Sequence, residues 1–176
     1  MSRSELDALD AGEIVTRPLA FERHGGRYVG GLAYQVVRAE ADQVWAALTD
    51  VASLPQALPR TKSAKIVATH DDHAHVELVQ GNNLVDATYT VRLERQTPDE
   101  LRFWLDHRRP HDIDDVWGYF RVQSLGRGRC LVTVAVALDM GPGLARMLFE
   151  RRIQELVLAT PRHIKQFVEP RALAAR

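Results

Sequence analysis

The sequence of 176 residues has one cysteine, Cys130, so no disulfide can form within the chain. It also lacks a charge imbalance, because 23 lysine and arginine residues match 23 aspartate and glutamate residues. Net charge therefore attracts the chain neither to nucleic acid nor to an acidic membrane surface. The longest uncharged apolar run, Cys130 to Leu138, is about half of the ~20 residues that a membrane-spanning helix needs.

Targeting and cofactor motifs are absent as well. The first thirteen residues contain no apolar stretch of the kind found in a secretory signal. No phosphate-binding or dinucleotide-binding glycine motif occurs, and there is no nucleophile elbow. We therefore expect a cytoplasmic protein that has no cofactor, no nucleic acid partner and no integral membrane association. The content of 45% hydrophobic and 26% charged residues is that of an ordinary globular chain.

Alternating apolar and polar residues predict six or seven antiparallel strands. The first strand, Gly31–Arg38, precedes a helix with apolar residues at helical spacing between Ala41 and Val51. A second, short helical segment must end before Pro59, because proline cannot continue a helix that needs its N–H group. From Thr61 to Met140, turn residues separate strands at hairpin spacing, which favours one antiparallel sheet with one solvated face.

The final segment returns to helical spacing. Apolar residues from Phe149 to Phe167 form one stripe, which predicts a helix over residues 142–168 that is buried against the sheet. Pro161 removes the backbone hydrogen bond to Val157 and should bend this helix. The sheet and the terminal helix together predict an α+β fold.

This order of elements resembles the helix-grip fold of the START-like, or SRPBCC, superfamily. The resemblance is carried by VVRAEADQVWAALTDVASLPQALP at 36–59, by DVWGYFRVQSLGRGRCLVTVAVALD at 115–139, and by the terminal helix. Within the first segment, Val44, Trp45 and Asp50 match the family pattern. The superfamily includes birch-pollen-allergen-like proteins, polyketide cyclases/aromatases and lipid transfer domains.

The resemblance implies a domain over residues 30–169. In this domain a curved antiparallel sheet of about seven strands wraps around the long C-terminal helix, and two short helices follow the first strand. Residues 1–29 then form an N-terminal extension, and residues 170–176 form a C-terminal tail.

The resemblance also implies a cavity between sheet and helix that binds a hydrophobic small molecule such as a lipid, quinone or polyketide. The apolar faces give the expected lining, and a volume of about 300–1,000 Å³ is usual for ligand sites. The sheet residues are Val76, Leu78, Tyr89, Val91, Phe103, Leu105, Val134 and Val136. The helix residues are Phe149, Ile153, Leu156, Val157 and Thr160. The alternative is that these side chains simply fill a dry core.

Three functions stay open: a carrier of an apolar ligand, a polyketide cyclase, aromatase or dehydratase, and a module that binds a protein partner. For an enzyme, Tyr89 is a candidate to stabilise an enolate by hydrogen bonding. His107 is a candidate acid or base at the cavity mouth, because histidine side chains titrate near neutrality. Strand 116–122 presents Phe120 on one face and Tyr119 on the other, and we expect Phe120 to lie inside.

The histidines do not predict a metal site. His107 and His111 are separated by Arg108 and Arg109, which would repel a cation, and Pro110 interrupts any regular spacing. We therefore expect no bound metal.

A second group, His70, His73 and His75, surrounds a hairpin turn. His73 and His75 share the strand face that alternates with the apolar one. We interpret all three as surface residues.

Overall fold

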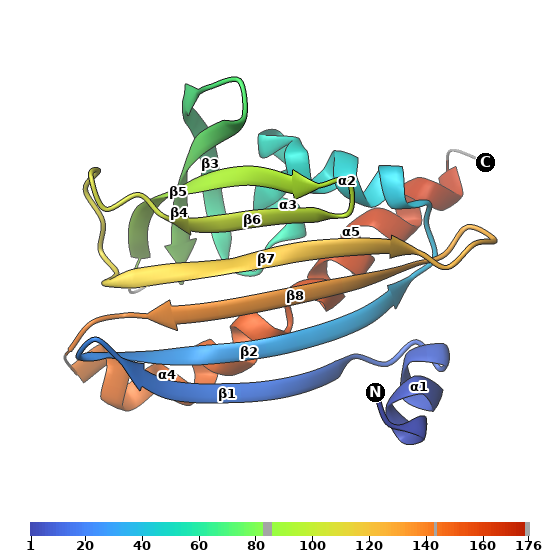
Figure 1. Ribbon diagram of the computed structural model, residues 1–176, viewed down its shortest axis with the longest axis horizontal. Helices are drawn as coiled ribbons and strands as arrows, with labels where there is room; N and C mark the ends of the chain where they lie inside the picture. The colour runs from blue at the N-terminus through green and yellow to red at the C-terminus, as the bar shows by residue number, and fades with distance from the viewer. Residues whose placement is uncertain (83–85, 143, 175–176) are drawn as a thin grey trace.

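Figure 1 shows a computed structural model of the protein, which describes residues 1–82, 86–142 and 144–174, the side chains of 144–149 excepted. Within these residues, eight antiparallel strands form one curved sheet in the order β1-β2-β8-β7-β6-β5-β4-β3. The strands are β1 Val15–Arg23, β2 Gly26–Val37, β3 Thr61–Thr69, β4 His73–Gly81, β5 Asp86–Thr97, β6 Glu100–Leu105, β7 Asp115–Ser124 and β8 Cys130–Asp139. The helices are α1 Arg3–Asp10, α2 Ala41–Thr49, α3 Leu54–Ala57, α4 Leu144–Leu158 and α5 Thr160–Ala174, with a 3₁₀ turn at Val51–Ser53. The α+β helix-grip fold is confirmed.

The sheet has one strand more than expected, and its first strand begins earlier in the sequence than predicted. β1 pairs with β2 from Val15 opposite Tyr34 to Arg23 opposite Gly26. The residue types of β1 do not predict a strand. Val15 is the one buried residue of β1, so buried and exposed residues do not alternate along it. The residues interpreted as an extension, 1–29, thus include β1 and the first part of β2.

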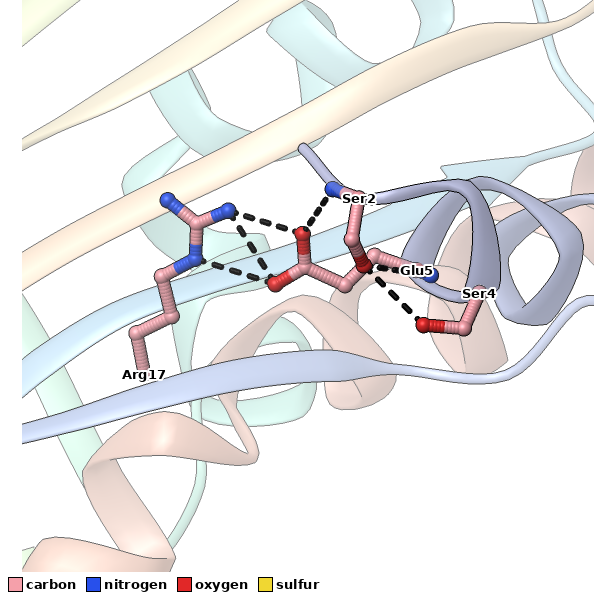
Figure 2. Close-up of polar contacts among 4 residues, drawn as sticks. All are labelled: Ser2, Ser4, Glu5 and Arg17. Atoms are coloured by element: carbon pink, nitrogen blue, oxygen red, sulfur yellow. Dashed lines mark hydrogen bonds and ion pairs between the residues drawn. The ribbon is translucent and has the colours of Figure 1, made fainter.

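A short helix precedes β1 and is tied to it by ionic contacts. The Ser2 hydroxyl accepts a hydrogen bond from the Glu5 N–H at 3.2 Å, and the Ser2 N–H donates to Glu5 at 2.6 Å. Such reciprocal capping satisfies two N–H groups at the start of α1. The same Glu5 carboxylate receives two guanidinium nitrogens of Arg17, the closest at 2.9 Å, as Figure 2 shows. The Arg17 guanidinium and the Ser2 N–H lower the pKa of Glu5 to about 2.

The C-terminal helix is broken where the sequence predicted a bend. α4 ends at Leu158 and α5 begins at Thr160, so Pro161 occupies the first turn of α5, where proline is tolerated. The predicted end of the helix is wrong, because α5 continues to Ala174 through part of the expected tail. Pro170 lies within this helix, and Ala172 beyond it is buried in the core.

The main core lies between the inner face of the sheet and helices α2, α3 and α5. Trp45 of α2 is 6% exposed within this core, and the Arg95 guanidinium of β5 lies 4.3 Å from its ring centroid. Among the described residues, no helix combines the length and apolarity needed to cross a bilayer.

Candidate functional site

A cavity of about 110 Å³ lies between strands β4–β8 and the helices that cover them. It is smaller than the volume expected for a ligand site. Nine predicted residues line it: Val76, Leu78, Tyr89, Val91, Phe103, Val136, Leu156, Val157 and Thr160. Strand parity and the helical stripe therefore identified one continuous surface, contributed by strands β4, β5, β6 and β8 and by both parts of the broken helix.

The remaining predicted residues are not brought to the cavity. Leu105 and Val134 are fully packed in the adjoining core, with 3% and 1% of their surface exposed. Ile153 is half-buried on α4 and does not line the cavity. The side chain of Phe149 lies outside the described residues. The prediction of Leu105, Val134 and Ile153 was wrong because parity gives the face of an element but not the position along it where space is left.

Other lining residues were not among those predicted to bind the ligand. They are Leu48, Leu54, Leu58, Pro59, Gln80, Leu93, Leu101, Val116, Phe120 and Leu138. Several continue a predicted face by two residues, so strict parity identifies them: Gln80 after Leu78, for example. Those near α3 carry no comparable signal, because their approach to the sheet depends on how a short helical segment packs. Phe120 lies inside, as expected for strand 116–122.

The polar end of the cavity is a part-buried chain of hydrogen bonds. The Tyr89 hydroxyl donates to the Gln80 side-chain oxygen, and Gln80 Nε2 donates to Thr61 Oγ1 at 2.7 Å. Register places Tyr89 opposite Leu78 in neighbouring strands, which brings its hydroxyl close to Gln80. Burial raises the pKa of Tyr89 well above its ordinary value, so the hydroxyl stays protonated and acts as a neutral donor.

A glycine makes room for the aromatic wall. Phe103 in β6 lies opposite Gly118 in β7, and its ring centroid is 5.3 Å from that of Phe120. A Cβ atom at position 118 would lie 2.7 Å from Phe103 Cζ and 2.0 Å from the Ala135 carbonyl oxygen. The Phe103 ring can therefore rest on the backbone of β7 and line the cavity only because residue 118 has no side chain.

Helix α4 covers the cavity and is fastened to the sheet by polar contacts. Arg27 at the start of β2 pairs with Glu150 at 2.8 Å. Gln154 Nε2 donates to the carbonyl oxygens of Leu19 and Gly30, at 3.0 and 3.1 Å. These contacts hold α4 across β1 and β2, with Leu156 turned to the cavity.

The candidate acid or base His107 does not line the cavity. Its side chain is 60% exposed, and its Nε2 atom lies 3.5 Å from Asp115 Oδ1. It borders instead a groove on the opposite face of strands β3–β6, which we call the outer groove. The outer groove is lined by Ala68, His70, His73, His75, Arg92, Trp104, Leu105, Asp106, His107, Arg108, Arg109 and Pro110. Placement of His107 at the cavity mouth was wrong, because β6 ends at Leu105 and the next five residues, 106–110, line the outer groove.

The interpretation of His73 and His75 as surface residues needs correction. They point away from the cavity, as parity indicates, yet only 14% and 15% of their side chains are exposed. The residues that cover them come from β5 and from the segment after β6, which are distant in sequence.

Comparisons with known proteins agree with this architecture. Residues 37–160 match the sequence model of the family described as "Polyketide cyclase / dehydrase and lipid transport". No curated protein matches the sequence.

Solved structures with the same fold have low sequence identity. TTHA0849 from Thermus thermophilus is 18% identical, with a TM-score of 0.67 over 82% of this chain and 97% of that one. The Zhui aromatase/cyclase from Streptomyces sp. R1128 is 16% identical, with a TM-score of 0.66 over 92% and 97%. Human STARD10 is 11% identical, with a TM-score of 0.64 over 94% and 77%. At these identities the likeness shows the fold alone.

Proposed function

Because the chain belongs to the polyketide cyclase/dehydrase and lipid transport family, we propose that it binds and carries a hydrophobic small molecule beneath helix α4. The observation that supports this proposal is the composition of the cavity wall. Its described lining is apolar except for Gln80, Tyr89 and Thr160. A mostly apolar site with a few polar groups is typical of small-molecule binding.

The polar groups are gathered rather than scattered. The Thr160 hydroxyl is committed to the Val157 carbonyl oxygen at 2.6 Å, which leaves the Tyr89–Gln80 pair to meet a polar atom of a ligand. A ligand hydroxyl can donate to the Tyr89 oxygen, and a ligand carbonyl can accept the Tyr89 proton in place of Gln80. An apolar molecule with one such group at its end therefore suits this wall. A polar end of this kind occurs in quinones, polyketides and many lipids.

The volume sets a limit on what enters without rearrangement. An engineered apolar cavity of about 150 Å³ holds benzene, so about 110 Å³ accommodates a group no larger than a single ring. A longer ligand must extend past Leu156 and Val157, and α4 must shift to admit it. The Arg27–Glu150 and Gln154 contacts are the polar links that such a shift would break.

The residues that line the cavity favour a carrier over an enzyme. Tyr89 is the one titratable side chain among the described lining residues, and its raised pKa keeps it protonated near neutral pH, so no phenolate is present to accept a proton. A cyclase remains the second candidate, supported by the Tyr89 hydroxyl as a hydrogen-bond donor to a developing enolate. The Zhui aromatase/cyclase has the same fold, but its name does not transfer an activity to this chain.

A substitution that fills the cavity tests the proposal. Leu156→Trp places an indole where a leucine lines the wall. It should weaken binding of the fluorescent apolar probe N-phenyl-1-naphthylamine, of which one ring enters the cavity and the remainder is admitted by the shift of α4, by at least about tenfold, equal to 1.4 kcal/mol. Glu155→Trp is the matched control, because the Glu155 side chain is 64% exposed on the same helix. Thermal unfolding verifies that both variants fold.

The expected result is one probe per chain in the wild type, unchanged affinity in Glu155→Trp and weakened affinity in Leu156→Trp. A folded Leu156→Trp variant that binds the probe as well as the wild type would exclude this cavity as the ligand site. Native mass spectrometry of protein purified from its own host then identifies the mass of the natural ligand.

A further inference from the structure

We propose that His70, His73 and His75 form a binding site for a divalent transition-metal ion, and that zinc fits it well. One ligand nitrogen from each of these histidines lies within 4.8 Å of the other two. Among the described residues, no other group of three or more histidines, cysteines or carboxylates is close enough together to surround one ion. It lies in the outer groove, on the side of the sheet opposite the apolar cavity. It is therefore independent of the proposed carrier function.

The hairpin between β3 and β4 brings the three histidines together. His73 and His75 lie two residues apart in β4, so their side chains project from the same face. His70 follows the end of β3, and its N–H donates to the His73 carbonyl oxygen at 2.8 Å across the turn. Three imidazoles from one hairpin therefore converge with little loop entropy to lose on binding.

The ring spacing is close to that of a metal complex. The ring centroids lie 4.4 Å apart for His70 and His73, 5.6 Å for His70 and His75, and 5.1 Å for His73 and His75. Three imidazoles bound tetrahedrally to zinc at about 2.0–2.1 Å have ring centroids about 5 Å apart. The ligand nitrogens themselves must approach to about 3.3 Å in that geometry. Rotation of the exposed His70 side chain supplies much of this adjustment.

Carboxylates hold two of the rings from behind. His75 Nδ1 lies 2.8 Å from Asp106 Oδ2, and His73 Nδ1 lies 2.6 Å from Asp72 Oδ1. A carboxylate at one ring nitrogen keeps the proton there and leaves a lone pair on Nε2 for a metal. Histidines that bind metals generally have such a partner at the other nitrogen, whereas a chance surface cluster needs none.

The nearby arginines do not leave the site positively charged. Arg92 lies opposite His75 in β5, and it pairs with Glu94 at 2.6 Å and approaches Asp72 at 3.8 Å. Arg109 pairs with Asp106 at 3.3 Å. Arg108 also lines the groove, so three guanidinium groups there are matched by the three carboxylates of Asp72, Glu94 and Asp106.

Three protein ligands leave one position of a tetrahedral ion free. Sites with three histidines and an open position bind water or another small ligand there, unlike closed structural sites with four protein ligands. The open position would face the outer groove, which His70 and the arginines border. Imidazole ligands also suit copper and nickel, so the ion present in the cell is set in part by availability.

Cobalt(II) titration of the full-length protein, first treated with a chelator and then freed of it, tests the site. We expect one cobalt per chain with the intense visible absorption of tetrahedral coordination, and displacement by zinc chloride. His70→Ala should weaken binding by at least about 100-fold. Because His70 is exposed, this variant should keep its fold, which thermal unfolding verifies. Asp106→Asn should weaken binding by about 10–100-fold, the usual effect of removing a carboxylate behind a ligand.

His111→Ala is the matched control, because His111 is exposed and lies outside the outer groove. Its cobalt affinity should equal that of the wild type. The proposal is overturned if the wild type binds less than one cobalt per chain at micromolar protein, or if His70→Ala binds as tightly as the wild type. Loss of binding in a double His107→Ala/His111→Ala variant, with His70→Ala unaffected, would place the metal at the other histidine pair.

Discussion

Tyr89→Phe removes one hydroxyl from the polar end of the cavity and keeps the ring. In the structure this hydroxyl donates to Gln80, and Tyr89 is 7% exposed. Losing a hydrogen bond costs about 0.5–1.5 kcal/mol, and leaving a buried acceptor without a donor costs about 1–3 kcal/mol. Because Gln80 is half-buried and can partly recover a partner, we expect a loss of about 1–2 kcal/mol in unfolding free energy.

A double-mutant cycle isolates this contact. Tyr89→Phe, Gln80→Leu and the combined variant are compared by urea unfolding, with unchanged m-values as the sign of an unchanged transition. Since Gln80→Leu removes the orphaned acceptor, the second substitution should cost less in the Tyr89→Phe background than in the wild type. A coupling of about 0.5–3 kcal/mol is expected for groups in direct contact. Additivity to within about 0.3 kcal/mol would refute the hydrogen bond and the polar end of the cavity with it.

The same variant separates the two functional candidates. A carrier that uses Tyr89 only to orient its ligand should lose less than about tenfold in affinity, the equivalent of one neutral hydrogen bond. An enzyme that uses the hydroxyl to stabilise an enolate should lose on the order of 10²-fold in rate while affinity is kept. Turnover of a polyketide-like substrate by the wild type, lost in a folded Tyr89→Phe variant, would replace the carrier proposal with the cyclase.

Three further outcomes are expected. Trp45→Ala should cost about 3–5 kcal/mol in denaturant unfolding, because a core indole is lost; a thermally neutral variant would contradict its packing. Gly118→Ala should cost about 3 kcal/mol or more, because the new methyl group meets the Ala135 carbonyl oxygen. The pKa of Glu5 is lowered to about 2 in the folded state, so its contact with Arg17 should be intact above the ordinary pKa of about 4.5 and lost as the pH falls towards 2. The protection of the α1 amides against exchange, relative to the intrinsic rate at each pH, should fall over that range, and Glu5→Gln should abolish the dependence.

The sequence predicted those elements whose side chains are buried on one face. In β4 and β5 apolar and polar residues alternate along the sequence, and the apolar stripe on the C-terminal helix is continuous enough to indicate which side meets the sheet. β1 was missed because most side chains of this edge strand are exposed, so apolar and polar residues need not alternate along it. Its place is set by backbone hydrogen bonds to β2, which leave no trace in residue type.

The candidate site shows a similar division. Parity identified Tyr89 as facing inward, and this orientation follows from the alternation within one strand. The position of the free space does not follow from it, because Val134 and Val136 have the same parity and only Val136 lines the cavity. Likewise, the half-buried state of His75 depends on Asp106, which a turn after β6 delivers to the outer groove. Both outcomes depend on contacts between segments that are distant in sequence.

The pairing of β2 with β8 determines when the protein can fold. These strands lie side by side, second and third from the β1 edge of the sheet (Figure 1). Val37 lies opposite Cys130, and Val29 lies opposite Leu138. A ribosome delivers β2 long before β8, so during synthesis β2 has only β1 to pair with, and a lone hairpin is marginally stable in water. Closing the long intervening loop is also slow compared with forming local hairpins. The junction of the β1–β2 hairpin with the rest of the sheet therefore forms late, after β8 emerges, and until then the unpaired edge of β2 is exposed to chaperones and to other nascent chains.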